Sequence, residues 1–191
     1  MRNLYNIKQK KVELRMRIQK KYGIVFWITG ISGSGKSTLS RRIYPFVKKK
    51  FGPTIMLSGD NLRKIFELNK YDKNYRMQVG KQYTKLLRFI VANKINVLFS
   101  VVGLFHALHI YNRKQLKNYI EILIDSNFKK TELRKQKFFY KNKINNVWGR
   151  DIKPEYPKKP HIVLKNDFKK NKNSLSIELI KKINNLRFKF V

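Results

Sequence analysis

Residues 30–37 read Gly-Ile-Ser-Gly-Ser-Gly-Lys-Ser, which matches every defined position of the phosphate-binding motif GxxxxGK[ST]. The apolar run 24–29 precedes the motif, and a pattern typical of a helix follows it from residue 36. A strand, a glycine-rich loop and a helix in this order are the context in which the motif binds phosphate. The stretch therefore predicts an α/β fold that holds a nucleoside triphosphate at this loop.

The residue types of the loop explain how it would hold a nucleotide. Glycines allow successive backbone N–H groups to turn toward phosphate oxygens, and the N-terminus of the next helix adds a partial positive charge. Lys36 can reach the β- and γ-phosphates, and the Ser37 hydroxyl can bind Mg²⁺. We therefore expect ATP and Mg²⁺ as cofactors, bound by Gly30, Ser32, Gly33, Ser34, Gly35, Lys36, Ser37 and Thr38.

Strand-like and helix-like segments alternate along the rest of the chain. Strands are expected at 24–29, 54–57, 96–102, 119–124 and 161–164, and helices at 36–50, from 62, and at 75–93, 108–116, 130–137 and 174–186. Such alternation is typical of a parallel sheet between two layers of helices. The sequence therefore predicts a three-layer P-loop NTPase fold for residues 23–191, preceded by a basic arm or helix at 1–22.

Asp60 is the acidic residue that we expect beside the phosphate site. The P-loop, the turn 58–61 and the loop 103–106 each follow a predicted strand, so they are expected to meet at one edge of a parallel sheet. No carboxylate occurs between Glu13 and Asp60. A phosphotransferase needs such a group to orient Mg²⁺ or to accept the proton of the acceptor hydroxyl. The alternative is that Asp60 caps the helix that follows, and one residue can do both.

The composition limits the partners of the protein. The formal net charge of +34 favours anionic ligands, but the lysines are spread along the whole chain rather than gathered in one patch. We therefore expect a small-molecule nucleotide substrate and no specific nucleic acid, and a basic nucleic-acid-binding P-loop protein is the rival interpretation. No segment is long and apolar enough to span a membrane, and the absence of cysteine agrees with a cytoplasmic protein.

Two further features carry both a functional and a structural interpretation. Arg63 and Arg76 are candidates for binding an anionic acceptor, although many surface cations would look the same in the sequence. The stretch 134–141 combines cations with aromatic residues, which suits a lid over the phosphates, a single-strand nucleic-acid site or a basic helix end. For His106, which has no zinc-ligand spacing, we expect a structural role.

Several motifs, in order, resemble the adenylylsulfate kinase family. Leu57-Ser58-Gly59-Asp60-Asn61-Leu62-Arg63 is similar to the family motif LDGDN(V/L)R, and the segments 71–76, 140–152 and 155–164 resemble the stretches that follow it. The similarity covers roughly residues 20–168. It implies a kinase that transfers the γ-phosphate of ATP to the 3′-hydroxyl of adenosine 5′-phosphosulfate, giving 3′-phosphoadenylyl sulfate in sulfate assimilation, and it implies a homodimer.

The same resemblance assigns roles to individual residues. It implies Asp60 and Lys36 as catalytic groups, and Ser37 and Asp60 at the metal. The residues that it implies for the acceptor nucleotide are Arg63, Arg76, Tyr71 and Phe105, with the two aromatic rings packing on the base.

The sequence departs from the family at three positions. Ser58 replaces the first aspartate of the DGDN motif, Gly103 replaces the serine of an FISP-like loop, and Val79 replaces an asparagine. The last two positions are expected near the acceptor, and the lid is shortened between residues 140 and 144. A kinase for another nucleotide-linked metabolite, such as cytidine diphosphoramidate in capsule modification, is therefore the alternative.

Overall fold

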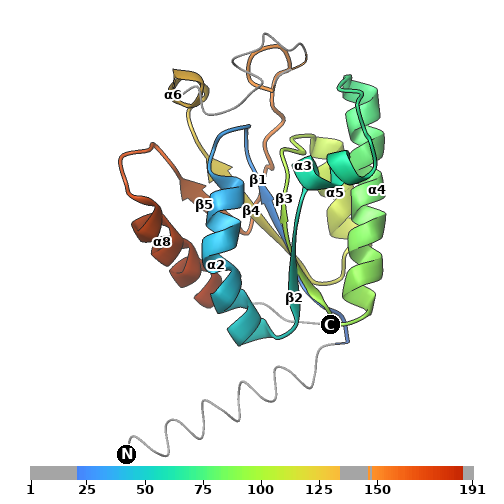
Figure 1. Ribbon diagram of the computed structural model, residues 1–191, viewed down its shortest axis with the longest axis vertical. Coiled ribbons are helices and arrows are strands. Elements are labelled where there is room, and N and C mark those ends of the chain that lie inside the picture. Colours follow the sequence, from blue (N-terminus) through green and yellow to red (C-terminus); the bar gives the residue numbers. More distant parts are fainter. Residues whose placement is uncertain (1–20, 134–145, 147, 187–191) are drawn as a thin grey trace, which may run out of the picture.

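The centre of the molecule is a parallel sheet of five strands, in the order β2-β3-β1-β4-β5 (Figure 1). The computed structural model describes residues 21–133, 146 and 148–186. The strands are β1 (Val25–Thr29), β2 (Thr54–Ser58), β3 (Asn96–Ser100), β4 (Tyr119–Asp125) and β5 (Ile162–Lys165). Every strand pairs in parallel with its neighbours, which confirms the predicted α/β P-loop architecture.

Helices cover both faces of this sheet (Figure 1). Helices α2 (Lys36–Phe51) and α8 (Lys172–Asn184) pack on one face, and α4 (Lys73–Ala92) and α5 (His106–Gln115) on the other. Side chains of β1 alternate between the two cores, so Phe26 lies in the first and Trp27 in the second. This alternation follows from the period of two in a strand, and it explains why β1 is buried along its whole length.

The short helix α3 (Gly59–Ile65) begins three residues earlier than the helix expected from Leu62. Ser58 is its N-cap, because the Ser58 hydroxyl accepts a hydrogen bond from the Asn61 backbone N–H at 3.1 Å. The interpretation of Asp60 as the cap was therefore wrong, and Asp60 lies in the first turn of the helix. A carboxylate at this position interacts favourably with the positive end of the helix dipole, but it does not act as the N-cap.

Other element boundaries differ from the prediction by a few residues. Strand β3 ends at Ser100 rather than at 102, and α5 begins at His106 rather than at 108. Helix α4 begins at Lys73 because the side chain of Asp72 accepts a hydrogen bond from the Tyr75 N–H at 2.9 Å. The segment 101–105 is therefore free of both elements and forms a loop at the carboxyl edge of the sheet.

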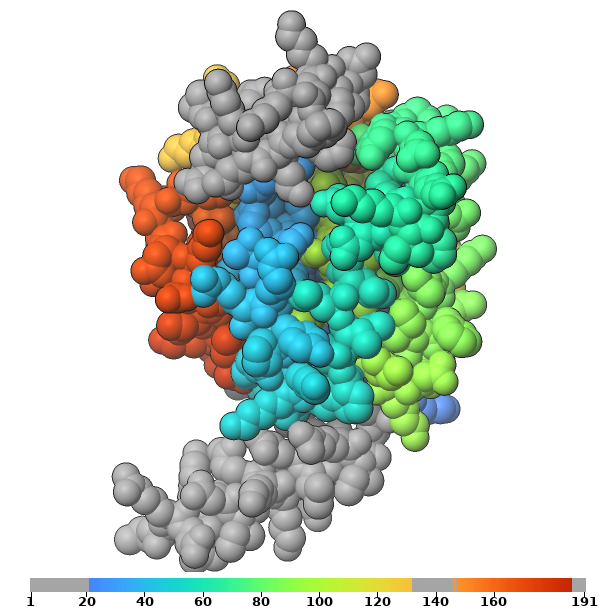
Figure 2. Space-filling view, viewed as in Figure 1, coloured from blue at the N-terminus to red at the C-terminus, as the bar shows by residue number. Residues whose placement is uncertain are grey.

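Strand β2 is an edge of the sheet and reaches the surface between α2 and α4 (Figure 2). Ile55 is 36% exposed and Met56 is 41% exposed. Among the residues described, no helix is long and apolar enough to cross a membrane. Most of the arm expected at 1–22, and the lid expected at 134–141 with its shortened end at 140–144, lie outside the described residues.

Candidate active site

A cavity of about 500 Å³ opens at the carboxyl edge of the sheet. Its walls come from the P-loop, the β2–α3 turn, helix α4 and the β3–α5 loop, and Trp148 completes the lining. The three turns that the sequence predicted at this edge therefore meet in one cavity, as expected. From the P-loop, the lining includes Ser32, Gly33, Gly35, Lys36, Ser37 and Thr38.

The P-loop needs glycine for its path across the sheet edge. Gly30 has a φ of 148°, and a Cβ at this position would lie 2.5 Å from the carbonyl oxygen of Ile124. Gly35, the residue before α2, has a φ of 96°. Residues that carry a Cβ rarely adopt these backbone angles, so replacing either glycine would strain the turn.

Hydrogen bonds within the P-loop, and one from the loop after β5, hold the P-loop in place. The ammonium group of Lys36 donates to the carbonyl oxygens of Gly30 at 2.9 Å and Ile31 at 2.7 Å. From the loop after β5, the Asn166 amide donates to the Ser34 carbonyl oxygen at 2.9 Å. Asn166 is buried, so this contact attaches the P-loop firmly to the end of the last strand.

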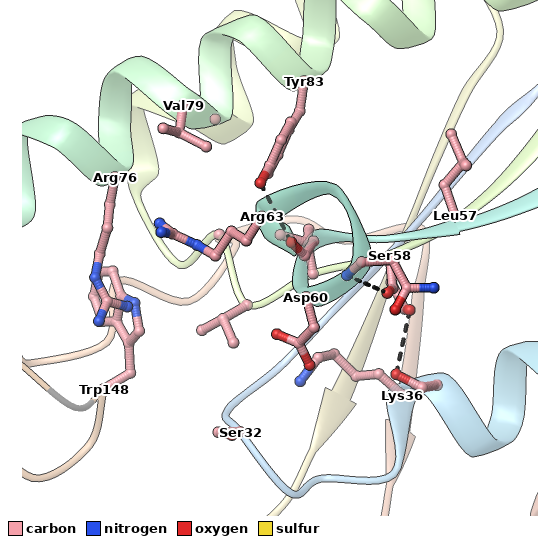
Figure 3. Close-up of a pocket in the computed structure, with 18 of the residues that line it drawn as sticks. Ser32, Lys36, Leu57, Ser58, Asp60, Arg63, Arg76, Val79, Tyr83 and Trp148 are labelled. Atoms are coloured by element: carbon pink, nitrogen blue, oxygen red, sulfur yellow. Dashed lines mark hydrogen bonds between the residues drawn. The ribbon is translucent and has the colours of Figure 1, made fainter. Parts of the chain in front are cut away.

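Oxygen atoms suited to magnesium lie close to the P-loop. The Ser37 hydroxyl is 3.4 Å from the Ser100 hydroxyl, and Asp60 lines the same cavity. Figure 3 shows the side chains of Asp60 and Lys36 pointing toward one another. No group of three or more His, Cys, Asp or Glu that could hold a metal occurs in the described part of the chain. This donor set fits Mg²⁺, which takes few protein oxygens and completes its shell with phosphate and water.

The opposite end of the cavity carries Arg63, Arg76 and Trp148 (Figure 3), and Tyr71 also lines the cavity. The Arg63 guanidinium lies 4.5 Å from the centre of the Tyr71 ring, and the Arg76 guanidinium lies 5.2 Å from the same ring. Arg76 is also 5.9 Å from the Trp148 ring. A cation that lies over the face of an aromatic ring is attracted by the quadrupole of that ring, which helps to hold these guanidinium groups in place.

Backbone carbonyls orient both guanidinium groups. Arg63 donates to the carbonyl oxygens of Leu68 and Lys70 at 2.7 and 3.0 Å, and Arg76 donates to that of Tyr71 at 2.6 Å. In the described ranges, neither arginine forms an ion pair with a carboxylate. Burial and the neighbouring Arg63 charge lower the pKa of Arg76 to about 10, which leaves it protonated at neutral pH. Two neighbouring cations that pair with no carboxylate of the described residues are suited to an anionic ligand.

Phe105 and Trp148 form one wall of the cavity together. Phe105 is 2% exposed, and its ring meets the Trp148 ring edge to face, with centroids 4.8 Å apart. We did not predict Trp148 as a site residue, although it stands inside the family-like stretch 140–152, which was the available signal. Tyr83 was also missed, and its hydroxyl donates to the Gly59 carbonyl oxygen at 3.3 Å (Figure 3).

The two departures expected near the acceptor do line this cavity. Val79 projects from α4, and Gly103 lies in the β3–α5 loop. Gly103 has a φ of 45°, and a Cβ there would lie 3.0 Å from the Trp27 ring. The serine of the family pattern would therefore be strained at this position, both by the backbone angle and by contact with the core.

A second cavity, of about 460 Å³, lies on the other side of the P-loop. Gly33, Gly35 and Thr38 line both cavities, so the loop separates the two spaces. Phe168 and Asn173, from the β5–α8 loop and α8, contribute to the outer wall. This space adjoins the phosphate loop and is large enough for the base and ribose of a nucleotide.

Outside the cavity lining, a buried polar network joins α5 to β4. Glu121 is fully buried and accepts hydrogen bonds from Tyr119 and Arg113, and its carboxylate lies 2.8 Å from His109. Burial alone would raise the pKa of Glu121, but His109, Tyr119 and the charge of Arg113 outweigh it and lower that pKa.

His106 is the first residue of α5, and its backbone N–H donates a hydrogen bond to the Glu155 carboxylate at 2.9 Å.

The sequence matches known proteins over most of its length. The model of the adenylylsulphate kinase family matches residues 22–165. A cytidine diphosphoramidate kinase from Campylobacter jejuni is 33% identical over 163 residues, which cover 83% of this chain and 95% of that protein. An adenylyl-sulfate kinase from Buchnera aphidicola is 29% identical over an alignment of 196 positions, and the alignment covers 94% of this chain and 93% of that protein.

Solved structures agree on the fold. The APS kinase of Mycobacterium tuberculosis, in complex with AMPPNP and APS, superimposes with a TM-score of 0.74 at 21% identity, covering 85% of this chain and 98% of that one. The crystal structure of APE1195 gives a TM-score of 0.76 at 22% identity, covering 86% of this chain and 96% of that one. The family model spans more than half of the chain, so the chain belongs to the adenylylsulphate kinase family, and the solved structures agree with its P-loop kinase fold.

Proposed function

We propose that this chain transfers the γ-phosphate of ATP to a hydroxyl group of a nucleotide-linked metabolite that carries phosphate or sulfate. The observation that carries the proposal is a single cavity with two chemically different ends. The P-loop forms one end, the guanidinium groups of Arg63 and Arg76 form the other, and Asp60 projects between them (Figure 3). A donor site and an anion site that share one cavity suit transfer between two bound substrates.

ATP would lie along the P-loop, with its base in the second cavity beside Phe168. Backbone N–H groups and Lys36 would bind the phosphates, and the Ser37 hydroxyl would bind Mg²⁺. When bound, the metal supplies positive charge that offsets the charge developing on the phosphoryl oxygens. Lys36 would leave the carbonyls of Gly30 and Ile31 to reach those oxygens.

Asp60 would act on the acceptor. As the one acidic residue among the described residues that line this cavity, it is the candidate to orient the acceptor hydroxyl and accept its proton. Arg63 and Arg76 would hold the anionic part of the acceptor by paired N–H donors. Binding an anion there would also relieve the repulsion between the two cations, which contributes to the lowered pKa of Arg76.

Cytidine diphosphoramidate is our first candidate acceptor, and adenosine 5′-phosphosulfate is the second. The relative from Campylobacter jejuni bears the first activity in its name and matches nearly its full length. Val79 and Gly103 depart from the adenylylsulfate kinase pattern and line the acceptor end of the cavity. The family model and the adenylyl-sulfate kinase relatives support the second candidate. The homodimer that the resemblance implies stays a prediction.

Release of ADP in the presence of each acceptor tests the proposal. With Mg·ATP and purified protein, we expect cytidine diphosphoramidate to raise the rate well above ATP hydrolysis alone, and adenosine 5′-phosphosulfate to raise it less. A reversed order would assign the chain to adenylylsulfate phosphorylation. If neither acceptor raised the rate, the proposed substrate class would be wrong.

A further inference from the structure

Glu155 contacts three segments that lie next to residues lining the Arg63 and Arg76 end of the cavity. One carboxylate oxygen accepts a hydrogen bond from the backbone N–H of His106, at the start of α5, at 2.9 Å. The other oxygen lies 3.4 Å from the ammonium group of Lys73, the first residue of α4. The backbone N–H of Glu155 donates to the carbonyl oxygen of Leu104 at 3.0 Å. One residue thus contacts the first turns of two helices and the loop between β3 and α5.

The contact with His106 fills a gap at the N-terminus of α5. The N-cap residue, Phe105, has no polar side chain and makes no side-chain capping bond. The first N–H groups of a helix have no partner within the helix, so an outside group must satisfy them. The carboxylate of Glu155 supplies this partner from a residue 49 positions further along the chain. Its negative charge also complements the positive end of the helix dipole.

The same segment carries the aromatic wall of the cavity. Trp148 lies seven residues before Glu155, in a turn closed by a bond from the Gly149 N–H to the Ile152 carbonyl oxygen at 2.9 Å. Trp148 packs on Phe105, the residue directly before the capped N–H. The segment 148–155 is therefore attached to the β3–α5 loop at both ends, by rings at Trp148 and by hydrogen bonds at Glu155.

We propose that Glu155 is a positioning residue for the acceptor: by capping α5 it holds the β3–α5 loop and the Trp148 segment in the arrangement that the acceptor requires. The inference rests on the proposed function, because it takes the Arg63 and Arg76 end of the cavity as the acceptor site. Glu155 itself does not line the cavity. Its effect reaches the acceptor through Phe105 and Trp148, which do.

The helix cap, rather than the ion pair, is the part of the contact that matters. The backbone hydrogen bond from His106 is the largest influence on the carboxyl group of Glu155 and lowers its pKa below the ordinary value. The Lys73 side chain is 61% exposed, and exposed ion pairs contribute little because water screens them. Loss of Lys73 should therefore leave the acceptor site almost unchanged.

Steady-state kinetics with four variants test this inference. For Glu155→Ala we expect the KM of the acceptor to rise about five- to tenfold, the size of a lost charged cap, with the KM of ATP unchanged. Glu155→Gln keeps an oxygen that can accept from His106 and should recover most of the loss. Lys73→Ala should stay within about twofold of wild type. Glu178→Ala removes an α8 carboxylate that pairs with Lys170 in the preceding loop, and as the matched control it should leave the KM of the acceptor at the wild-type value.

A merely structural role would give a different pattern. Partial unfolding lowers the fraction of active enzyme, and therefore kcat, without changing either KM. Equal KM values for wild type and Glu155→Ala would overturn the inference, as would a loss in Lys73→Ala as large as that in Glu155→Ala. If wild-type protein itself showed no acceptor-dependent ADP release, the proposed function would fail instead.

Hydrogen exchange tests the contact without any acceptor. In full-length protein, peptides covering the start of α5 should exchange faster in Glu155→Ala than in wild type, because the His106 N–H has lost its partner. Peptides covering the P-loop should exchange at the same rate in both proteins. Unchanged exchange at His106 would show that the carboxylate does not cap this helix.

Discussion

The two ends of the cavity are built in opposite ways. The P-loop end comes mostly from one contiguous stretch, 32–38, whose lysine donates hydrogen bonds to carbonyl oxygens of the same loop. The end that we propose for the acceptor comes from α3, α4, the β3–α5 loop and the segment around Trp148, which are separate in the chain. The donor end therefore depends on local backbone geometry, whereas the acceptor end depends on how distant segments pack.

This difference has a consequence for substrate choice within one fold. A contiguous loop changes little unless its own residues change, so phosphate binding persists in proteins with different acceptors. When several segments form one end of a cavity, a single replacement in any of them, such as Val79 or Gly103, can change the shape and polarity of its lining. We therefore expect substitutions at the two ends to have separable effects on ATP and on the acceptor.

The largest effect is expected from the two catalytic groups that we propose, Lys36 of the P-loop and Asp60 between the two ends of the cavity. Lys36→Ala and Asp60→Ala should each lower kcat by about 10²- to 10³-fold, because they remove charge stabilisation and the candidate base. ADP release measures the rate, and circular dichroism checks that the fold survives. Near-normal turnover of Asp60→Ala would remove the catalytic role that we propose for it.

At the acceptor end, the next largest effect is expected from the two arginines. Arg63→Ala or Arg76→Ala should raise the KM of the acceptor about 10- to 100-fold, the value of a charge-assisted hydrogen bond. Binding of an ATP analogue, measured by calorimetry, should stay the same. A matched loss of nucleotide affinity would contradict the separation of the two ends.

A smaller effect on stability is expected at Gly103. Gly103→Ala should lower the free energy of unfolding by about 1–3 kcal/mol, because its φ of 45° disfavours a side chain and the new Cβ would press on Trp27. The comparison is Gly103→Ala introduced into a Trp27→Phe background, because the smaller ring lacks the indole carbon on which the new Cβ would press, while the backbone strain at residue 103 stays the same. Chemical denaturation measures both. An equal loss in the two backgrounds would show that contact with Trp27 adds nothing.

The smallest expected effect is on the stability of the fold at acidic pH, through the buried carboxyl group of Glu121. The pKa of Glu121 is lowered in the folded protein, so the unfolded state takes up this proton more readily. The stabilisation is therefore complete above the ordinary value of 4.5 and is lost as pH falls below it. The charged or titratable groups facing Glu121 are His109, Arg113 and Tyr119 on its carboxylate and His161 on its backbone N–H.

Thermal unfolding between pH 6 and pH 3.5 checks the role of Glu121. We expect the Tm of wild type to fall with acid more steeply than that of Glu121→Gln, which cannot titrate. Glu121→Gln should also be less stable at neutral pH, because it weakens a buried hydrogen-bonded group. Parallel curves for the two proteins would show that Glu121 contributes nothing to acid sensitivity.

Much of the fold was predictable because its signals are local. A few neighbouring residues are enough to predict the alternation of strands and helices, the end of α2 at Gly52 and the P-loop. The start of α3 was not, because Ser58 and Asp60 are both good cap residues. The choice between them was made by the end of β2, whose pairing with β3 continues to Ser58 and so leaves this residue extended.

The sequence by itself determined the P-loop, the parallel α/β architecture and the position of Asp60 at the sheet edge. Backbone angles and side-chain periodicity over a few residues are sufficient for each of these. Only the tertiary structure decided that Trp148 packs on Phe105, that Glu155 caps α5 and that Glu121 meets His109. These partners come from different elements, and no local periodicity encodes which side chains two packed segments bring together. The acceptor end belongs to this second group, because packing, rather than a contiguous motif, forms it.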